Sequence, residues 1–169
     1  MKTGAILALI GGILSLFTVF LLSFYQIEVM PGVYLSGSGL GLLMSVGDVF
    51  TLATYYGQTM WIVLEIIFLI CIFGGVLSIV GLKVRALAII GGIFSIFIAV
   101  FHMLVAFGAL PAEIGAAMAF FATDPALAPI PLHVGVGQYL APGGSAGLGI
   151  YLLLGGGVLS FVGGVLPRD

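Results

Sequence analysis

Apolar residues in this chain are gathered into four long stretches, and polar residues fall mainly between them. The stretches cover residues 4–25, 59–82, 86–108 and 146–166. Each matches the roughly 20 apolar residues that an α-helix needs to cross the hydrocarbon core of a bilayer. The pattern predicts an all-α integral membrane protein, in which four transmembrane helices form a single domain over residues 1–169.

Two long connections join the first span to the second and the third span to the fourth. In the connection at residues 26–58, Pro31-Gly32 is a turn signal. Residues 49–56 are rich in β-branched and aromatic side chains, which favours a β-strand there. In the connection at residues 110–145, Pro111 suits the first position of a short helix that ends at about Ala122. We therefore expect the two connections to carry small amounts of secondary structure of their own.

The chain repeats itself. Residues 8–17 read ALIGGILSLF and residues 88–97 read AIIGGIFSIF, 80 positions on. Residues 74–81 read GGVLSIVG and residues 156–163 read GGVLSFVG, 82 positions on. The pattern predicts two tandem parallel repeats of two helices each, related by an axis along the membrane normal. The repeats are residues 1–82 and 83–169.

The basic residues predict the orientation of the spans. Lys2, Lys83, Arg85 and Arg168 fall at the two ends of the chain and in the short middle turn, and neither long connection holds a Lys or Arg. With four spans, these three places lie on one side of the membrane. Because cytoplasmic segments carry an excess of Lys and Arg, we expect cytoplasmic termini, outer long loops and a multi-pass protein of the cell membrane.

Composition supports the bilayer and excludes several functions. The chain is 62% hydrophobic and 6% charged, against about a quarter charged in soluble domains. Four basic residues cannot track a nucleic-acid backbone. Cys71 has no second cysteine to pair with, and His102 and His133 show no metal-ligand spacing. Nucleotide and nucleophile motifs are absent from the sequence. We therefore expect no metal, no cofactor and no enzymatic activity.

Small residues recur at every fourth position in the spans. Such spacing lets helix backbones approach closely, which is a main attraction between helices in lipid. The stripes serve either oligomerisation or packing within the chain. They are Gly4, Ala8 and Gly12; Gly74 and Ser78; Gly91, Ser95 and Ala99; and Gly156, Ser160 and Gly164.

Two ionisable residues lie inside the spans. Glu65 and His102 each lie about six residues inside the predicted outer end of a span, roughly 9 Å deep at 1.5 Å per residue. A hydrogen bond between them would relieve the cost of an unpaired carboxylate in the membrane. Tyr151 and Thr18 are expected at a similar depth. The helical wheel, however, places Glu65 about 180° from Gly74, which points it to a second packed face, to a partner chain or to an outward cavity.

This polar layer has three interpretations. It is a structural lock inside the bundle, a proton or ion route, or a contact with a neighbouring subunit or a quinone-like ligand. The leading functional hypothesis is a non-enzymatic structural or accessory subunit that assembles with itself or a larger membrane complex. Glycine-rich helix faces and apolar outer loops would make the contacts. The alternatives are a small proton or ion channel or carrier using Glu65 and His102, and a quinone- or lipid-binding accessory subunit of an electron-transfer complex.

The layout of four spans, two long outer loops and a short inner turn is similar in topology to tetraspan junction and scaffold proteins of the claudin kind. The Gly-Leu-Trp and paired-cysteine signature of that family is missing, because Trp61 is the only tryptophan and Cys71 the only cysteine. The resemblance therefore covers topology alone.

Overall fold

The computed structural model describes residues 2–31, 33–57, 59–107, 109 and 144–167. Within these residues, four helices are long and apolar enough to cross a membrane, at Thr3–Leu21, Trp61–Val80, Arg85–Leu104 and Leu148–Val165. The prediction of four transmembrane helices is confirmed. Three of the spans belong to continuous helices, which are α1 (Thr3–Leu21), α5 (Arg85–Ala106) and α7 (Leu148–Val165).

The second span is interrupted rather than continuous. It consists of α3 (Thr59–Ile72) and α4 (Gly74–Val80), with Phe73 between them at φ −73° and ψ 0°. Gly74 and Gly75 follow at once, and glycine pairs are a common cause of sharp changes in helix direction. The break lets α3 and α4 bury different faces, which a single helical wheel over residues 59–82 could not represent.

The first connection is folded, and the strand expected at residues 49–56 is wrong. The strands are β1 (Tyr25–Met30) and β2 (Val33–Gly37), and the following segment is the helix α2 (Gly39–Tyr55). Thr51 and Thr54 fit a helix because their hydroxyls donate to the carbonyls of Gly47 and Phe50, four residues earlier, at 2.8 and 2.7 Å. Local β propensity was therefore overridden.

A small sheet joins the two connections. Strand β3 (Gly144–Ala146) pairs with β1, which also pairs with β2, so the order is β2-β1-β3 and both pairings are antiparallel. Tyr25 has Gly37 as its partner on one side and Ala146 on the other. Because β1 follows α1 and β3 precedes α7, the sheet ties the ends of these two helices together. The expected helix at residues 111–122 lies outside the described residues.

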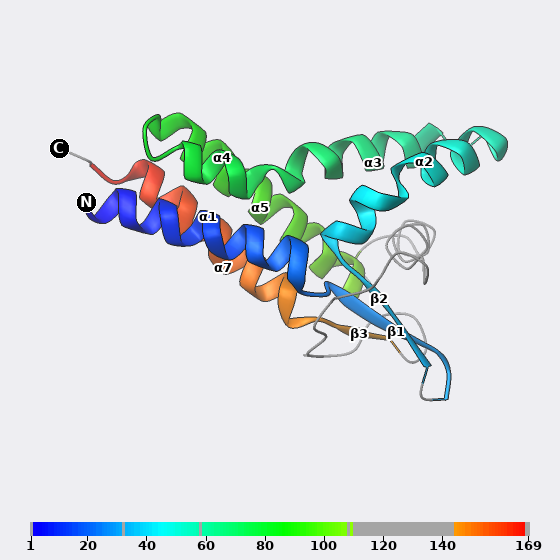
Figure 1. Ribbon diagram of the computed structural model, residues 1–169. Coiled ribbons are helices and arrows are strands. Elements are labelled where there is room, and N and C mark those ends of the chain that lie inside the picture. Colours follow the sequence, from blue (N-terminus) through cyan, green and yellow to red (C-terminus); the bar gives the residue numbers. More distant parts are fainter. Residues whose placement is uncertain (1, 32, 58, 108, 110–143, 168–169) are drawn as a thin grey trace.

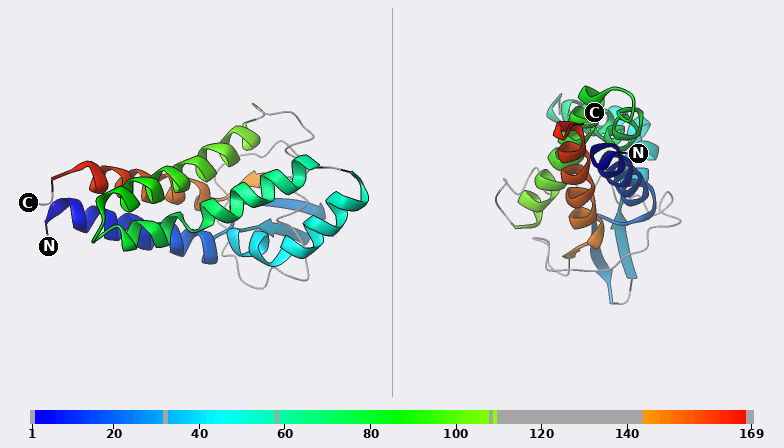
Figure 2. Two further views of the ribbon diagram at one scale, coloured as in Figure 1. Left: turned by 90° about the horizontal axis from the view of Figure 1, so that it is seen from above. Right: turned by 90° about the vertical axis from the view of Figure 1, so that its left-hand side faces the viewer.

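The helices α1, α4, α5 and α7 pack against one another and form the bundle (Figures 1 and 2). The start of α1, the end of α7 and the α4–α5 turn lie at one end, which we call the terminal end. The sheet and the α2–α3 helical hairpin lie at the other, the loop end (Figures 1 and 2). Gly57 turns α2 into α3 with φ +67°, a conformation that favours glycine.

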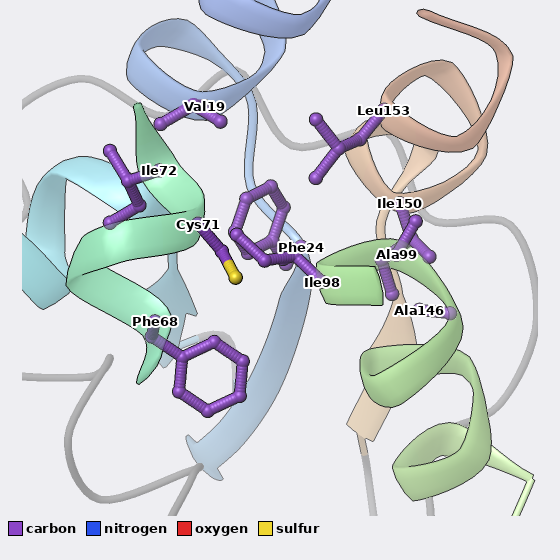
Figure 3. Packing of buried hydrophobic residues seen from close by; sticks show 10 residues of the cluster. All are labelled: Val19, Phe24, Phe68, Cys71, Ile72, Ile98, Ala99, Ala146, Ile150 and Leu153. Carbon is purple, nitrogen blue, oxygen red and sulfur yellow. The ribbon is translucent and has the colours of Figure 1, made fainter. Parts of the chain in front are cut away.

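The bundle is packed with small residues inside and large apolar residues outside. In α1 the buried residues include Ala8, Gly12 and Ser15, whereas Ile13 and Phe17 are exposed. A water-facing surface would reverse this distribution, so the pattern fits a lipid environment. Larger side chains fill the interior only towards the loop end, where Phe24, Phe68 and Ile98 meet (Figure 3).

Candidate functional site

His102 is the central polar residue of the loop end. It lies on α5, is 0% exposed, and is surrounded by aromatic rings. Ring centroids of Phe24, Phe68 and Phe101 lie 5.0, 5.5 and 6.2 Å from its own. Phe24 comes three residues after the end of α1, so this layer lies where the bundle meets the sheet.

The hydrogen bonding of His102 defines its tautomer. Nδ1 lies 2.9 Å from the carbonyl oxygen of Ile98. Because a carbonyl oxygen only accepts, Nδ1 carries the proton, and Nε2 presents a lone pair. Nε2 is buried and has no hydrogen-bond partner within the described part of the chain. This nitrogen is therefore an acceptor without a donor.

Glu65 is the second acceptor at this level. It is 1% exposed on α3, one helical turn before Phe68, whose ring lies against His102. Neither Oε1 nor Oε2 has a hydrogen-bond partner among the described residues. The direct Glu65–His102 hydrogen bond expected from the sequence is thus not formed. Glu65 and Gly74 are both buried, so the second span is packed on two faces, with the break at Phe73 between them.

The other two predicted members of the layer differ from each other. Thr18 is 0% exposed on α1, and its hydroxyl has no partner in the described segments. A hydroxyl on a helix can donate to the carbonyl oxygen four residues earlier, as that of Ser78 does to Gly74 at 2.9 Å. Thr18 is therefore a weaker candidate for a functional polar site than Glu65 or His102. Tyr151 is half-buried in the first turns of α7. It has an interaction partner and is therefore set apart from the acceptor pair.

A metal centre does not arise from these residues. Within the described residues, no group of three or more His, Cys, Asp or Glu side chains is placed to hold a metal ion. Cys71 is buried in the same hydrophobic cluster as Phe24 and Phe68 (Figure 3). It acts there as a small apolar residue.

The small-residue stripes face one another between helices of this chain. A Cβ at Gly74 would lie 2.7 Å from the carbonyl oxygen of Gly91, and a Cβ at Gly156 would lie 2.9 Å from that of Gly11. These are the α4–α5 and α1–α7 contacts. Gly164 in turn lies against Ile89 on α5, with a Cβ position 2.6 Å from the Ile89 side chain.

A second type of contact alternates with the first around the bundle. A Cβ at Gly12 would lie 3.0 Å from the Gly75 carbonyl oxygen, on α4, and one at Gly92 would lie 2.7 Å from the Gly157 carbonyl oxygen, on α7. Gly11, Gly75, Gly92 and Gly157 are not members of the predicted small-residue stripes, although each lies at one of these contacts. The near-identical segments that hold them were the signal that could have found them.

The basic residues in the described part of the chain lie at the terminal end. Lys2 and Lys83 are exposed. Arg85 donates from Nε to the carbonyl oxygen of Gly164 at 3.1 Å and from Nη2 to that of Val165 at 2.6 Å. Arg168 lies outside the described residues.

An apolar groove of about 370 Å³ runs along the outer surface of α5 and α7. Ile93, Ile96, Phe97, Val100 and Phe161 line it without a polar group. An acyl chain fits this lining, and a quinone head group would find no hydrogen-bond donor or acceptor in it.

Four apolar helices with lipid-type outer surfaces place the chain in the class of multi-pass membrane proteins. No protein-family model, curated protein or solved structure matches the chain.

Proposed function

We propose that this protein is a non-enzymatic structural or accessory subunit of a membrane assembly, and that the assembly contact is made by its loop end. The chain covers some of its surfaces with its own helices and leaves others open, and the open surfaces are the candidates for this contact.

The glycine-rich faces are poor candidates for the contact, because they are occupied within the chain. Gly12, Gly74, Gly91 and Gly156 all lie against the chain's own helices. This packing supports the intramolecular interpretation of the stripes over their use in oligomerisation.

The observation that carries the proposal is the exposure of aromatic side chains at the loop end. Tyr55, Phe107 and Tyr56 are 80%, 70% and 61% exposed, more than any other large apolar side chain among the described residues. Tyr55 and Tyr56 stack edge to face at 5.0 Å at the tip of the α2–α3 hairpin, which projects beyond α1 and α7 (Figure 1). Exposed tyrosines are typical of protein contacts.

Two similar repeats would explain why the helix contacts come in two alternating kinds. The α4–α5 contact uses Gly74 with Gly91, and the α1–α7 contact uses Gly156 with Gly11. Gly156 lies 82 positions after Gly74, and Gly91 lies 80 positions after Gly11, so each contact matches the other through the repeat. We infer a pseudo-two-fold axis along the bundle, with residues 1–82 and 83–169 as its halves. The basic residues at the terminal end support a cell-membrane protein with cytoplasmic termini.

The test is the mass and composition of the particle extracted from membranes in a mild detergent. Assembly predicts a particle larger than one chain with its detergent, and Tyr55→Ser with Tyr56→Ser should reduce it. Phe17→Ser, a change on the exposed side of α1, is the matched control and should leave the particle intact. A single chain in the wild-type particle would refute the proposal.

A second candidate function is a proton or ion route. It is favoured by the carboxyl group of Glu65 and Nε2 of His102, which have no hydrogen-bond partner among the described residues. Buried ionisable residues in spans often mark such routes. Reconstituted liposomes test it: a flux that Glu65→Gln abolishes, while Asp48→Asn leaves it unchanged, would support the route. Absence of flux from liposomes that hold folded protein would rule it out.

A further inference from the structure

We propose that the contact between α5 and α7 binds one anionic phospholipid, with an acyl chain in the apolar groove and the phosphate group at the guanidinium of Arg85. The inference is independent of the proposed assembly function, because the exposed aromatic side chains of the loop end take no part in it.

The apolar groove is the first part of this lipid site. It has a volume of about 370 Å³ and is lined, without a polar group, by Ile93, Ile96, Phe97, Val100 and Phe161. Ile93, Phe97 and Val100 are 47%, 44% and 40% exposed, so the groove opens on the outer surface of the bundle. A polar ligand would leave its donors and acceptors unsatisfied there, whereas a hydrocarbon chain has none to lose. The lining therefore selects an acyl chain.

Arg85 lies on the same α5–α7 contact, towards the terminal end. A Cβ at Gly157 on α7 would lie 2.8 Å from Cγ1 of Ile96, and a Cβ at Gly164 would lie 3.2 Å from the carbonyl oxygen of Arg85. The guanidinium of Arg85 also donates to the carbonyl oxygens of Gly164 and Val165, which holds it against α7. The cation and the groove therefore lie along one contact between the two helices.

The spacing between Arg85 and the groove suits a phospholipid. Ile93 and Val100 follow Arg85 by 8 and 15 residues, which places them about 12 and 22 Å from it along the helix axis at 1.5 Å per residue. One leaflet of a bilayer has about 15 Å of hydrocarbon below about 6 Å of head-group region. A lipid with its phosphate at Arg85 would thus have the middle and the end of an acyl chain at the depth of the groove.

The guanidinium of Arg85 also suits the phosphate group. It carries five N–H donors, and the bonds to Gly164 and Val165 use two of them. Its side chain is exposed, and neither α5 nor α7 holds an Asp or Glu within its bounds to offset the charge. Because the planar fork of arginine matches phosphate oxygens, this end of the contact favours an anionic head group over a zwitterionic one.

The contact between α1 and α4 matches the α5–α7 contact through the sequence repeat, and it has different residues at both key positions. Counting 80 positions back gives Ala5 for Arg85 and Phe20 for Val100. Alanine carries no charge, and the larger Phe20 packs against the hydrophobic cluster of the loop end. The helix contact itself therefore requires neither a cation nor a small side chain at these positions.

The test is native mass spectrometry of the purified protein in mild detergent, after incubation with phosphatidylglycerol and phosphatidylcholine that carry the same oleoyl chains. We expect one phosphatidylglycerol per chain, retained about fivefold better than phosphatidylcholine, since one basic residue near an anionic lipid contributes about this factor. Arg85→Gln should remove the preference and keep the retention of phosphatidylcholine, because glutamine can still donate to a carbonyl oxygen but has no charge. Lys2→Gln removes the same charge at an exposed residue just before α1, and this control should keep the preference.

The groove is tested by Val100→Phe, which should fill it and lower the retention of both lipids. Val76→Phe on α4 is the matched control, because Val76 is 41% exposed and Val100 is 40% exposed, and it should leave both unchanged. If Val100→Phe does not fold, Phe161→Ala, which removes one wall of the groove, should lower retention in the same way. Equal retention of the two lipids by the wild type, a preference that survives Arg85→Gln, or equal effects of Val100→Phe and Val76→Phe would each overturn the lipid site. The particle mass of the same variants reports on assembly separately.

Discussion

Arg85, the first residue of α5, donates from Nε to the carbonyl oxygen of Gly164 near the end of α7, at 3.1 Å. A second donor, Nη2, reaches the next carbonyl oxygen, that of Val165, at 2.6 Å. The last carbonyls of a helix lack partners within it and carry partial negative charge. Arg85, which is expected to set the membrane topology, thus also caps the C-terminal end of the neighbouring helix α7.

Replacing Arg85 should therefore weaken the fold. Arg85→Ala is expected to lower the free energy of unfolding by about 1 kcal/mol, in line with the net value of such hydrogen bonds. Arg85→Lys should recover part of the loss, since one ammonium cannot match the guanidinium fork. Lys83→Ala makes the same charge change at an exposed site two residues earlier and is the control. Thermal unfolding in detergent measures all three, and equal effects of Arg85→Ala and Lys83→Ala would argue against the contact.

The contacts Gly74–Gly91 and Gly156–Gly11 are similarly close. We therefore expect alanine at Gly74 and alanine at Gly156 to lower the free energy of unfolding by similar amounts. A Cβ at Gly74 or Gly156 would meet its nearest neighbour at 2.7 Å, so either alanine forces the helices apart. Each is expected to lower the free energy of unfolding by about 1–3 kcal/mol, as overpacking does. Gly155→Ala is the adjacent control, because nothing lies within 4 Å of its Cβ position. We expect it to be neutral or to stabilise α7 by up to about 1 kcal/mol. A large loss for only one of Gly74→Ala and Gly156→Ala would contradict the equivalence of the contacts.

The spans could be predicted because length and hydropathy alone decide whether a segment can cross a bilayer. The break at Phe73 could not, because apolar residues continue through it and only the glycine pair at 74–75 hints at a change of direction. The strand expected at residues 49–56 is wrong because β propensity is a weak guide where tertiary packing decides. Glu65 and His102 were found from the sequence, since charges in spans stand out, but their lack of a mutual hydrogen bond depends on side-chain geometry.

Replacing His102 tests whether this residue is needed to stabilise the fold or is present for a function other than stability. His102→Leu removes the bond to Ile98, and it also removes Nε2, which has no hydrogen-bond partner in the described part of the chain. Leucine already occupies the matching position at Leu22, 80 positions earlier. We expect the free energy of unfolding to fall by about 1 kcal/mol. If His102 were instead the necessary partner of a buried charge on Glu65, the loss would be about 3–5 kcal/mol. Chemical unfolding in mixed micelles separates these values, with Phe17→Leu on the exposed face of α1 as a reference change.

The charged residues at the two ends of the bundle predict its orientation in the membrane. Lys83 is exposed in the α4–α5 turn at the terminal end, and Asp48 is exposed on α2 at the loop end. Because basic residues favour the cytoplasmic side, the loop end should face outwards.

Cys71 is the only cysteine and is buried, so a Cys71→Ser background carries no other thiol. In that background, Asp48→Cys should react with a membrane-impermeant maleimide on intact cells, and Lys83→Cys should react only after the cells are permeabilised. The reverse result would invert the topology, and reaction of both on intact cells would contradict placement of the two ends on opposite sides of the membrane.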